Sequence, residues 1–374
     1  MAEDGNLKVM LIGGLLDTDS PSIYAVDLAG EMIRRGLSVR FVCAGTKCDA
    51  AESDIKRING AARTDDAVLE LPGLSTPLLS IYKKMQLKRF ARSYKPKLVH
   101  ALCEDAACAA SSVASACNIP YLVTCHTYSD DPPSDDSRHL FRMIAVSDAL
   151  REYLVNKAGV HKEKMIVLPN GVNLRRYDPL PSEESDRVPV IGGFGSLVER
   201  KGFEYLLRAC SKVIEAGHEI HVLIAGEGPQ EQKLRKLVRE LKMVDKVTFS
   251  RYPFRAHSVI KEMDVFVMSS VRESLGFSAL EALAYAKPVV SFGVGGAYSF
   301  LRHEKTGLLC NAKDVDALAA AIERLVDDPE LRTKLGKAGR KFVEENFSLE
   351  AIAERLVHIY RQAVSQHKGA NGAS

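Results

Sequence analysis

The sequence has no long hydrophobic run and little net charge, and both absences exclude classes of protein. No apolar stretch reaches the ~18 residues that a membrane-spanning helix needs. The start Met1-Ala-Glu-Asp4 lacks the basic residues that open a signal peptide. A net charge of +3 is too small to indicate nucleic-acid binding by itself. We therefore expect a cytoplasmic protein that does not bind nucleic acid.

The cysteines form no paired motif. None of the eight belongs to a Cys-x-x-Cys pair, and most lie in apolar runs. This pattern is typical of buried thiols in a reducing compartment, and not of a disulfide framework or a zinc site. The chain also has no solenoid repeat and no low-complexity tract.

What the chain does contain is a recurring β-α pattern. The 374 residues are too many for one ordinary core, so two domains are expected. Short runs rich in Val, Ile and Leu recur and are apolar throughout, which indicates strands buried on both faces. The expected strands are 8–14, 38–43, 98–103, 121–126, 143–147, 165–168, 188–194, 220–225, 246–250, 265–269, 288–292 and 307–310. This order predicts an α/β protein with two doubly wound parallel sheets of Rossmann type.

Proline and charge interrupt the pattern in Asp178-Pro-Leu-Pro-Ser-Glu-Glu-Ser-Asp-Arg187, which we interpret as the domain boundary. The expected domains are therefore 1–177 and 178–347. Apolar residues recur at helical spacing over 348–365, which predicts a helix that packs back toward the N-terminal domain. Residues 366–374 are expected to form a disordered tail.

The stretch Arg272-Glu-Ser-Leu-Gly-Phe-Ser278 joins an expected strand to an expected helix and carries the main functional signal. Residues 276–278 open the helix, where backbone N–H groups and the helix dipole attract phosphate. Glu273 and Glu281 lie eight positions apart around this helix start. Ionised carboxylates accept hydrogen bonds from hydroxyl groups. A sugar nucleotide combines phosphate with hydroxyls in this way.

Glu281 also has a structural interpretation. Ser278-Ala-Leu-Glu281 fits a capping box, in which the glutamate only satisfies the helix start. Glu273 lies in the loop before the glycine and has no such alternative.

A second loop, Gly192-Gly-Phe-Gly-Ser-Leu-Val-Glu-Arg-Lys-Gly202, also leaves an expected strand and enters a helix. Its glycines let the backbone approach a ligand, and Arg200 and Lys201 can neutralise a diphosphate. The loop lacks the G-x-G-x-x-G spacing of a dinucleotide fold, and a solvated basic turn is the structural alternative. Ala225-Gly-Glu-Gly-Pro229 ends another strand with two glycines. This segment fits either a loop that lies against a ligand or a simple tight turn.

Together these elements resemble the retaining, nucleotide-sugar-dependent glycosyltransferases of family 4, which have the two-domain GT-B fold. In the second half the resemblance is carried by Gly195-Ser-Leu-Val-Glu-Arg-Lys-Gly202, Gly226-Glu-Gly-Pro229, and Glu273-x7-Glu281 followed by Gly295-Gly296. In the first half it is carried by Val99-His-Ala101, Thr124-Cys-His126, Ile144-Ala-Val-Ser147 and Leu168-Pro-Asn-Gly-Val172. The similarity covers about residues 8 to 365.

The resemblance implies an acceptor-side domain followed by a donor-side domain, with an interdomain cleft between them. Lys201, assisted by Arg200, would bind the donor diphosphate, and Glu281 would bind the ribose hydroxyls. Glu273 would bind hydroxyls of the transferred sugar, and His126 would reach toward that sugar from the first domain. Backbone amides at the helix start would meet the phosphate or the sugar, namely those of Gly276, Phe277 and Ser278.

The resemblance also implies the reaction. A hexosyl group would pass with retention at the anomeric carbon to a saccharide, lipid-linked or small-molecule acceptor. No cofactor and no bound metal are expected, because the Arg-Lys pair and the helix dipole would stabilise the departing diphosphate. The donor base, the sugar and the acceptor cannot be predicted from these residues. A nucleotide-sugar epimerase on the same fold and a catalytically silent nucleotide-sugar-binding protein remain as alternatives.

Three positions depart from the family pattern. Ser196 stands where family members often have arginine, and Ser299 stands where a glutamate commonly follows the glycine pair. The glycine pair of the first loop is replaced near Asp19-Ser20. Because that loop normally borders the donor phosphate and the acceptor, its change motivates the silent-binder alternative.

Three other features receive a structural interpretation. Asp17-Thr-Asp19 resembles the Asp-x-Asp metal site of a different glycosyltransferase fold, but its place in the first loop favours a solvated loop or a helix cap. The acidic segment Asp130–Asp136 could bind a cation, but a mobile acidic loop is the favoured reading. His100 is interpreted as an interior histidine bonded to backbone.

The segment Lys83–Lys97 is basic and amphipathic. It has seven basic residues and no acidic one, with Leu87, Phe90 and Tyr94 at helical spacing. Such helices can bind anionic lipid, so peripheral contact with the inner face of the membrane is one hypothesis. A helix with one core stripe and one solvated basic face is the structural alternative.

Overall fold

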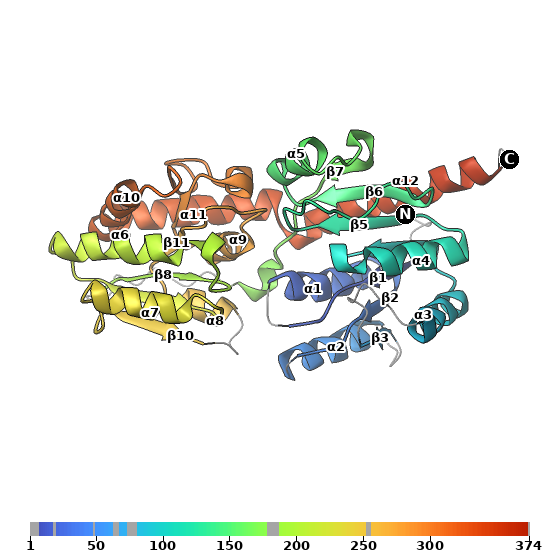
Figure 1. The fold of residues 1–374 in the computed structure, drawn as a ribbon, viewed down its shortest axis with the longest axis horizontal. Coiled ribbons are helices and arrows are strands. Elements are labelled where there is room, and N and C mark those ends of the chain that lie inside the picture. The colour runs from blue at the N-terminus through green and yellow to red at the C-terminus, as the bar shows by residue number, and fades with distance from the viewer. Residues whose placement is uncertain are drawn as a thin grey trace. The chain divides into compact units, whose positions relative to one another are not determined.

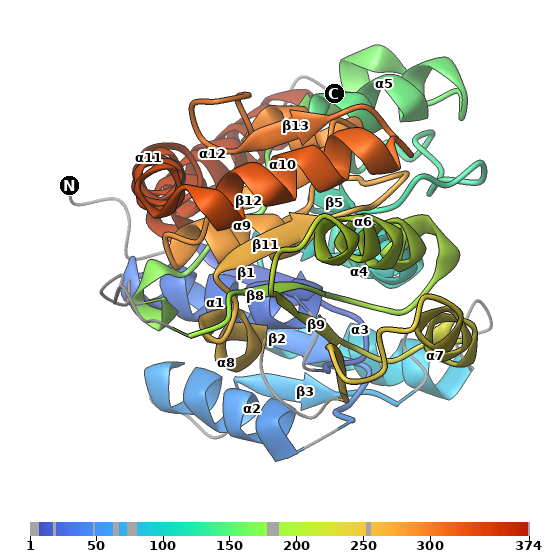
Figure 2. The same ribbon diagram turned by 90° about the vertical axis from the view of Figure 1, so that its left-hand side faces the viewer.

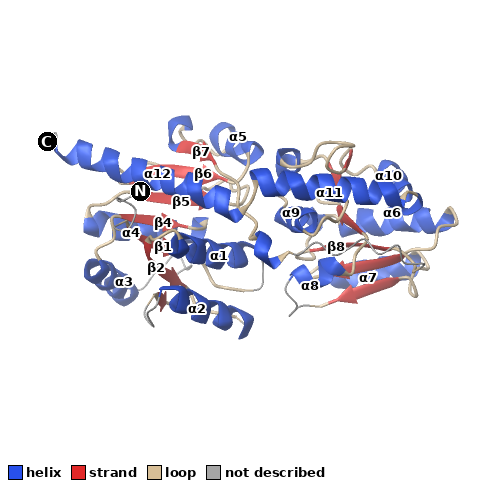
Figure 3. Cartoon of the chain, turned by 180° about the vertical axis from the view of Figure 1, so that it is seen from behind, coloured by secondary structure: helices blue, strands red, loops and turns tan. Residues whose placement is uncertain are grey.

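The computed structural model describes residues 7–17, 20–47, 49–62, 67–72, 81–177, 187–251 and 256–372. The chain forms two compact units. Unit 1 comprises Met1–Gly171 and Leu349–Ser374, and unit 2 comprises Val172–Ser348. Figure 1 labels most elements of both units, and Figure 3 shows helices around the strands in each of them. Both units are α/β domains.

In unit 1 a parallel sheet has the strand order β3-β2-β1-β4-β5-β6-β7. Its strands are β1 (Lys8–Ile12), β2 (Ser38–Cys43), β3 (Val68–Glu70), β4 (Leu98–Ala101), β5 (Tyr121–Cys125), β6 (Leu140–Ala145) and β7 (Met165–Val167). Its helices are α1 (Ser20–Arg34), α2 (Asp49–Ala62), α3 (Ile81–Tyr94), α4 (Ala107–Cys117), α5 (Asp148–Asn156) and α12 (Leu349–Gly372). Every residue of β4 and β5 is buried, as apolar runs covered on both faces require.

In unit 2 a second parallel sheet has the order β10-β9-β8-β11-β12-β13. Its strands are β8 (Val190–Phe194), β9 (His221–Ala225), β10 (Val247–Ser250), β11 (Val265–Met268), β12 (Val289–Phe292) and β13 (Leu308–Cys310). Its helices are α6 (Phe203–Glu215), α7 (Glu231–Glu240), α8 (Ala256–Lys261), α9 (Phe277–Ala284), α10 (Val315–Asp327) and α11 (Pro329–Asn346). In Figure 2, α6, α7 and α10 cover one face of this sheet, and α8, α9 and α11 cover the other.

The predicted fold class is confirmed, and each of the twelve expected strands overlaps an observed one; β6 begins three residues before its expected start at Met143. The sequence prediction missed β3. This strand has only three residues, none of them fully buried, so it lacks the apolar run that marks the others. The two units meet in the sequence at Gly171 and Val172, six positions before the expected boundary. Residues 178–186 of the expected linker lie outside the described residues.

The C-terminal helix α12 belongs to unit 1. Its helical structure continues to Gly372, into the segment from residue 366 that was expected to be disordered. At the start of that segment the His367 ring contacts the His139 ring at 5.6 Å, and His367 Nε2 lies 3.1 Å from the Asn118 carbonyl oxygen. Among the described residues, no helix is long and apolar enough to cross a membrane.

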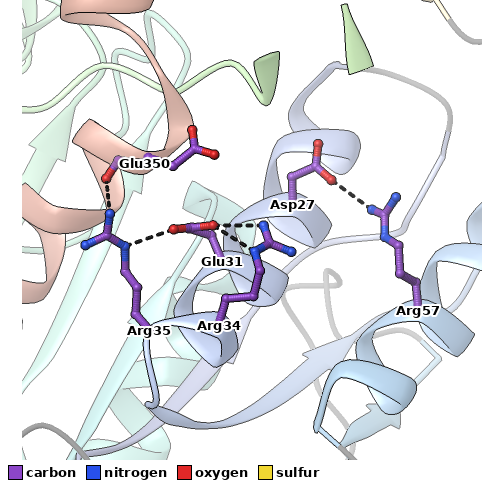
Figure 4. A network of polar contacts seen from close by, with 6 residues as sticks. All are labelled: Asp27, Glu31, Arg34, Arg35, Arg57 and Glu350. Atoms are coloured by element: carbon purple, nitrogen blue, oxygen red, sulfur yellow. Dashed lines mark hydrogen bonds and ion pairs between the residues drawn. The ribbon is translucent and has the colours of Figure 1, made fainter. Parts of the chain in front are cut away.

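A charged network holds the start of α12 against α1 (Figure 4). The buried Glu31 carboxylate accepts hydrogen bonds from Arg34 Nε at 2.9 Å and from Arg35 Nε at 3.0 Å. Arg35 Nη2 also donates to the Glu350 carbonyl oxygen at 2.6 Å. Arg57 of α2 pairs with Asp27 of α1 at 2.8 Å. Three helices of unit 1 are thereby joined through buried carboxylates that all have cationic partners.

Candidate active site

The centre of the unit 2 sheet brings two distant loops together. β8 pairs with both β9 and β11, so the strand order reverses between β8 and β11. Ligands of doubly wound sheets bind at such a switch point, beyond the carboxyl ends of the strands. The chain leaves β8 through the short 3-10 helix Glu199–Lys201 and leaves β11 through the loop that carries Glu273.

Lys201 and Glu273 form an ion pair at this point, with 2.6 Å between Nζ and Oε2. The lysine side chain is 16% exposed and the glutamate side chain 6%. Ser270 Oγ donates to the same carboxylate oxygen at 3.1 Å, and the Val271 N–H donates to the Arg200 carbonyl oxygen at 2.9 Å. Arg200 itself is exposed. The structure therefore places the two predicted cations and Glu273 in one cluster.

The pKa of Glu273 reflects this environment. Burial alone would raise the pKa of the carboxyl group above its ordinary value of 4.5. The charge and hydrogen bond of Lys201 oppose burial, and the Arg200 charge and the Ser270 hydroxyl add to them, so that the pKa is lowered overall. Glu273 is consequently ionised at neutral pH and can accept hydrogen bonds from hydroxyl groups.

The start of α9 lies next in the chain. Gly276 is its N-cap and has a φ of 92°, in the left-handed region that favours glycine. Phe277 and Ser278 form the first turn, whose N–H groups and dipole suit an anion. The Gly296 N–H donates to the Glu273 carbonyl oxygen at 2.9 Å, which joins the glycine pair after β12 to the same loop.

Glu281 lies in the interior. Its side chain is fully buried, and its Oε1 accepts a hydrogen bond from the Tyr177 hydroxyl at 2.6 Å. The Tyr177 ring packs edge-on against Tyr285, with 5.0 Å between centroids. The capping-box interpretation is wrong, because the N-cap is Gly276 and not Ser278. The ribose contact of Glu281 stays a prediction.

In unit 1, His126 directly follows β5, and both its ring nitrogens have contacts. Nε2 lies 2.9 Å from the Leu102 carbonyl oxygen, and Nδ1 lies 3.5 Å from Asn170 Nδ2. The backbone N–H of His126 donates to Glu104 Oε1 at 2.7 Å. The ring is half-buried. Its predicted contact with a sugar stays a prediction.

His100 is an interior histidine, as expected, but its partners are hydroxyl groups and not backbone. Nδ1 lies 2.7 Å from the Tyr360 hydroxyl of α12, and Nε2 lies 2.8 Å from Thr124 Oγ1. Burial, aided by the nearby His126, lowers the pKa of His100 to about 3. His100 is therefore neutral and joins α12 to β4 and β5.

The acidic features of unit 1 have protein partners. Asp17 pairs with Lys47 at 3.1 Å, while Asp19 lies outside the described residues. Asp135 Oδ2 accepts from the His161 backbone at 2.7 Å and contacts His161 Nδ1 at 2.8 Å. Ligand atoms of Asp135, Asp136 and His161 lie within 4.8 Å of one another, close enough for a cation. The two contacts of Asp135 with His161 give this loop a structural function.

Comparisons with known proteins agree with this architecture. Residues 22–176 match the model of Glycosyltransferase Family 4, and residues 180–342 match that of Glycosyl transferases group 1. An uncharacterised glycosyltransferase of Methanocaldococcus jannaschii is 27% identical over 95% of both chains. The D-inositol 3-phosphate glycosyltransferase of Kineococcus radiotolerans is 27% identical, over 96% of this chain and 94% of its own.

Solved structures share the fold. Anabaena HepE in complex with UDP and glucose has a TM-score of 0.79 at 17% identity, over 96% of this chain and 100% of its own. A glycosyltransferase of Rickettsia africae has a TM-score of 0.80 at 19% identity, over 96% of this chain and 99% of its own. The family models and the shared two-domain architecture together identify a glycosyltransferase of the GT-B fold. The chain belongs to the family 4 glycosyltransferases.

Proposed function

We propose that the protein transfers a hexosyl group from a nucleoside-diphosphate sugar to a saccharide, lipid-linked or small-molecule acceptor, with retention and without a metal. The observation that carries this proposal is the Lys201–Glu273 pair beside Arg200 and the start of α9. The cluster combines cations and N–H groups for a diphosphate with a carboxylate for hydroxyls.

The chemistry follows from where charge develops. Departure of the nucleoside diphosphate builds negative charge, which Arg200, Lys201 and the α9 dipole would stabilise. Glu273 would orient the transferred sugar through its hydroxyls, and Glu281 would hold the ribose. His126 would contact the sugar from unit 1. The acceptor would attack the face that the diphosphate leaves, which retains the anomeric configuration.

The named relatives support this range of donors and acceptors. HepE was solved with UDP-glucose as well as with UDP. A GDP-mannose-dependent mannosyltransferase of Corynebacterium glutamicum acts on a monoacylated phosphatidylinositol monomannoside and is 33% identical over 51% of this chain. A lipopolysaccharide core biosynthesis glycosyltransferase of Rhizobium meliloti is 32% identical over 47% of this chain.

Donor binding and turnover test the proposal directly. A panel of uridine, guanosine and adenosine diphosphate sugars should contain a donor that binds. At a concentration of a hundred times its dissociation constant, that donor should stabilise the protein by about 2.7 kcal/mol. That donor should then be transferred or slowly hydrolysed at equal rates with and without EDTA. Strict metal dependence would contradict the charge scheme. Conversion to an epimeric donor would identify an epimerase, and binding without turnover a silent binder.

We also propose that α3 brings the enzyme to anionic lipid. Leu87 is buried, as the core stripe requires, and Phe90 and Tyr94 are half-buried. On the opposite side, Tyr82 is 73% exposed and Met85 62% exposed, and basic residues surround them. Exposed apolar residues within a basic face are the combination that membrane interfaces favour.

Vesicle co-sedimentation tests this contact. The protein should bind anionic vesicles at low salt and release them at high salt, because salt screens surface charge. It should not bind neutral vesicles. Met85→Ser should weaken the binding, whereas Val244→Ser, a change at an exposed apolar residue of unit 2, should not. Absence of binding to anionic vesicles at low salt would contradict the proposal.

A further inference from the structure

We propose that Glu104 is a positioning residue that fixes the turn carrying His126. This inference rests on the proposed function, in which His126 contacts the transferred sugar. Glu104 follows β4 and His126 follows β5, and these strands are parallel neighbours, with Ala101 in register with Val123. Their carboxyl ends therefore lie side by side, although the two residues are 22 positions apart in sequence.

A single carboxylate oxygen of Glu104 accepts three hydrogen bonds from this turn. Its Oε1 lies 2.7 Å from the His126 backbone nitrogen, 2.7 Å from the Thr127 backbone nitrogen and 2.9 Å from Thr127 Oγ1. Bonds of this length to an ionised acceptor belong to the strong class. The turn is otherwise exposed at Thr127, so the carboxylate gives it an internal anchor.

The anchored backbone determines the orientation of the His126 ring. A carbonyl oxygen only accepts, so the Leu102 contact requires a hydrogen on Nε2. In the tautomer with its hydrogen on Nε2, Nδ1 carries the lone pair. Its contact with Asn170 is 3.5 Å long, at the limit for a hydrogen bond, so a sugar hydroxyl could replace it. Loss of the Glu104 anchor would let the turn move and would remove the fixed orientation of Nδ1.

Two variants of Glu104 separate geometry from charge. Glu104→Gln keeps a carbonyl oxygen whose two lone pairs can still accept hydrogen bonds from the turn, whereas Glu104→Ala keeps no acceptor. We expect Glu104→Ala to lower kcat about tenfold or more while the donor KM changes less than about threefold, because the lost contact acts in the transition state. Glu104→Gln should stay within about threefold of the wild type. Asp105→Asn, an exposed change in the same 3-10 helix, is the matched control.

Nitrogen-15 spectra of histidine-labelled protein supply a readout that is independent of turnover. In the wild type and in Glu104→Gln, His126 should show the Nε2-protonated tautomer. In Glu104→Ala its two nitrogens should shift toward the average of both tautomers. A Glu104→Gln variant as impaired as Glu104→Ala, or an unchanged His126 signal in Glu104→Ala, would overturn the inference.

His126→Ala, measured in parallel, separates this inference from the proposed function. Wild-type turnover in His126→Ala would contradict the proposed sugar contact, and the spectra would still decide whether Glu104 positions the ring. Reduced turnover in His126→Ala together with normal turnover in Glu104→Ala would leave the proposed function intact and would overturn the role of Glu104.

Discussion

Replacing Lys201 with methionine is expected to lower turnover at least about tenfold, which corresponds to ~1.4 kcal/mol or more in the barrier. It should also destabilise unit 2 by about 3–5 kcal/mol, because it leaves the carboxylate of Glu273 buried without its cation. Both partners are well shielded from water, at 16% and 6% exposed, so screening by solvent is weak. Activity assays and urea denaturation measure the two effects.

The pH dependence of stability should change sign in this variant. In the wild type the pKa of Glu273 is lowered below 4.5, so its contribution is complete above that pH and is lost as the pH falls through the lowered value. Without Lys201, burial becomes the larger influence and should raise the pKa of Glu273 above 4.5. Stability should then be lost as the pH rises from 4.5 toward the raised value.

Two further variants serve as controls. Glu273→Gln removes the charge but keeps the shape, and it should also lower turnover about tenfold or more. Lys212→Met breaks the Lys212–Asp316 pair, which is similarly short at 2.7 Å but lies in solvent, with side chains 50% and 82% exposed. This exposed pair should matter little to stability and not at all to turnover. Wild-type rates in both Lys201→Met and Glu273→Gln would contradict the site assignment.

A structural feature could be predicted from the sequence where it leaves a local pattern, and could not where it depends on contacts between distant residues. Buried strands could be predicted because parallel sheets require continuous apolar runs. Lys201 and Glu273 could each be predicted from a local motif, but their pairing could not. They are 72 residues apart, and only the strand order that makes β8 and β11 neighbours brings them together.

Other contacts had a weak local signal or none. Tyr177 is a single aromatic residue in a loop, and nothing in its neighbours points to Glu281. Glu104 could have been suspected, because it follows a buried strand at the edge where ligands bind, but its three hydrogen bonds depend on the register of β4 with β5. Contacts between the ends of different strands become visible only when the register is known.

Gly202→Ala should separate the two loops of the candidate site. Gly202 follows Lys201 and has a φ of 63°, in the left-handed region. A Cβ atom there would lie 2.1 Å from the Ser269 carbonyl oxygen, so the backbone of one loop must move. Ser269 Oγ also donates to the Lys201 carbonyl oxygen at 3.3 Å, and this contact should be lost with the movement.

We expect a cost of ~1–2 kcal/mol for the left-handed conformation and a further ~1–3 kcal/mol for the overpacked contact. Turnover should fall with stability, because the displaced loop carries Lys201 away from Glu273. Gly217→Ala is the matched control: its φ is 99°, and a Cβ atom would meet nothing within 4 Å. It should show only the conformational cost and normal turnover. The contrary outcome is that both variants are equally destabilised and turn over normally. In that case the left-handed backbone conformation alone, and not the close approach of the two loops, would explain why a glycine follows Lys201.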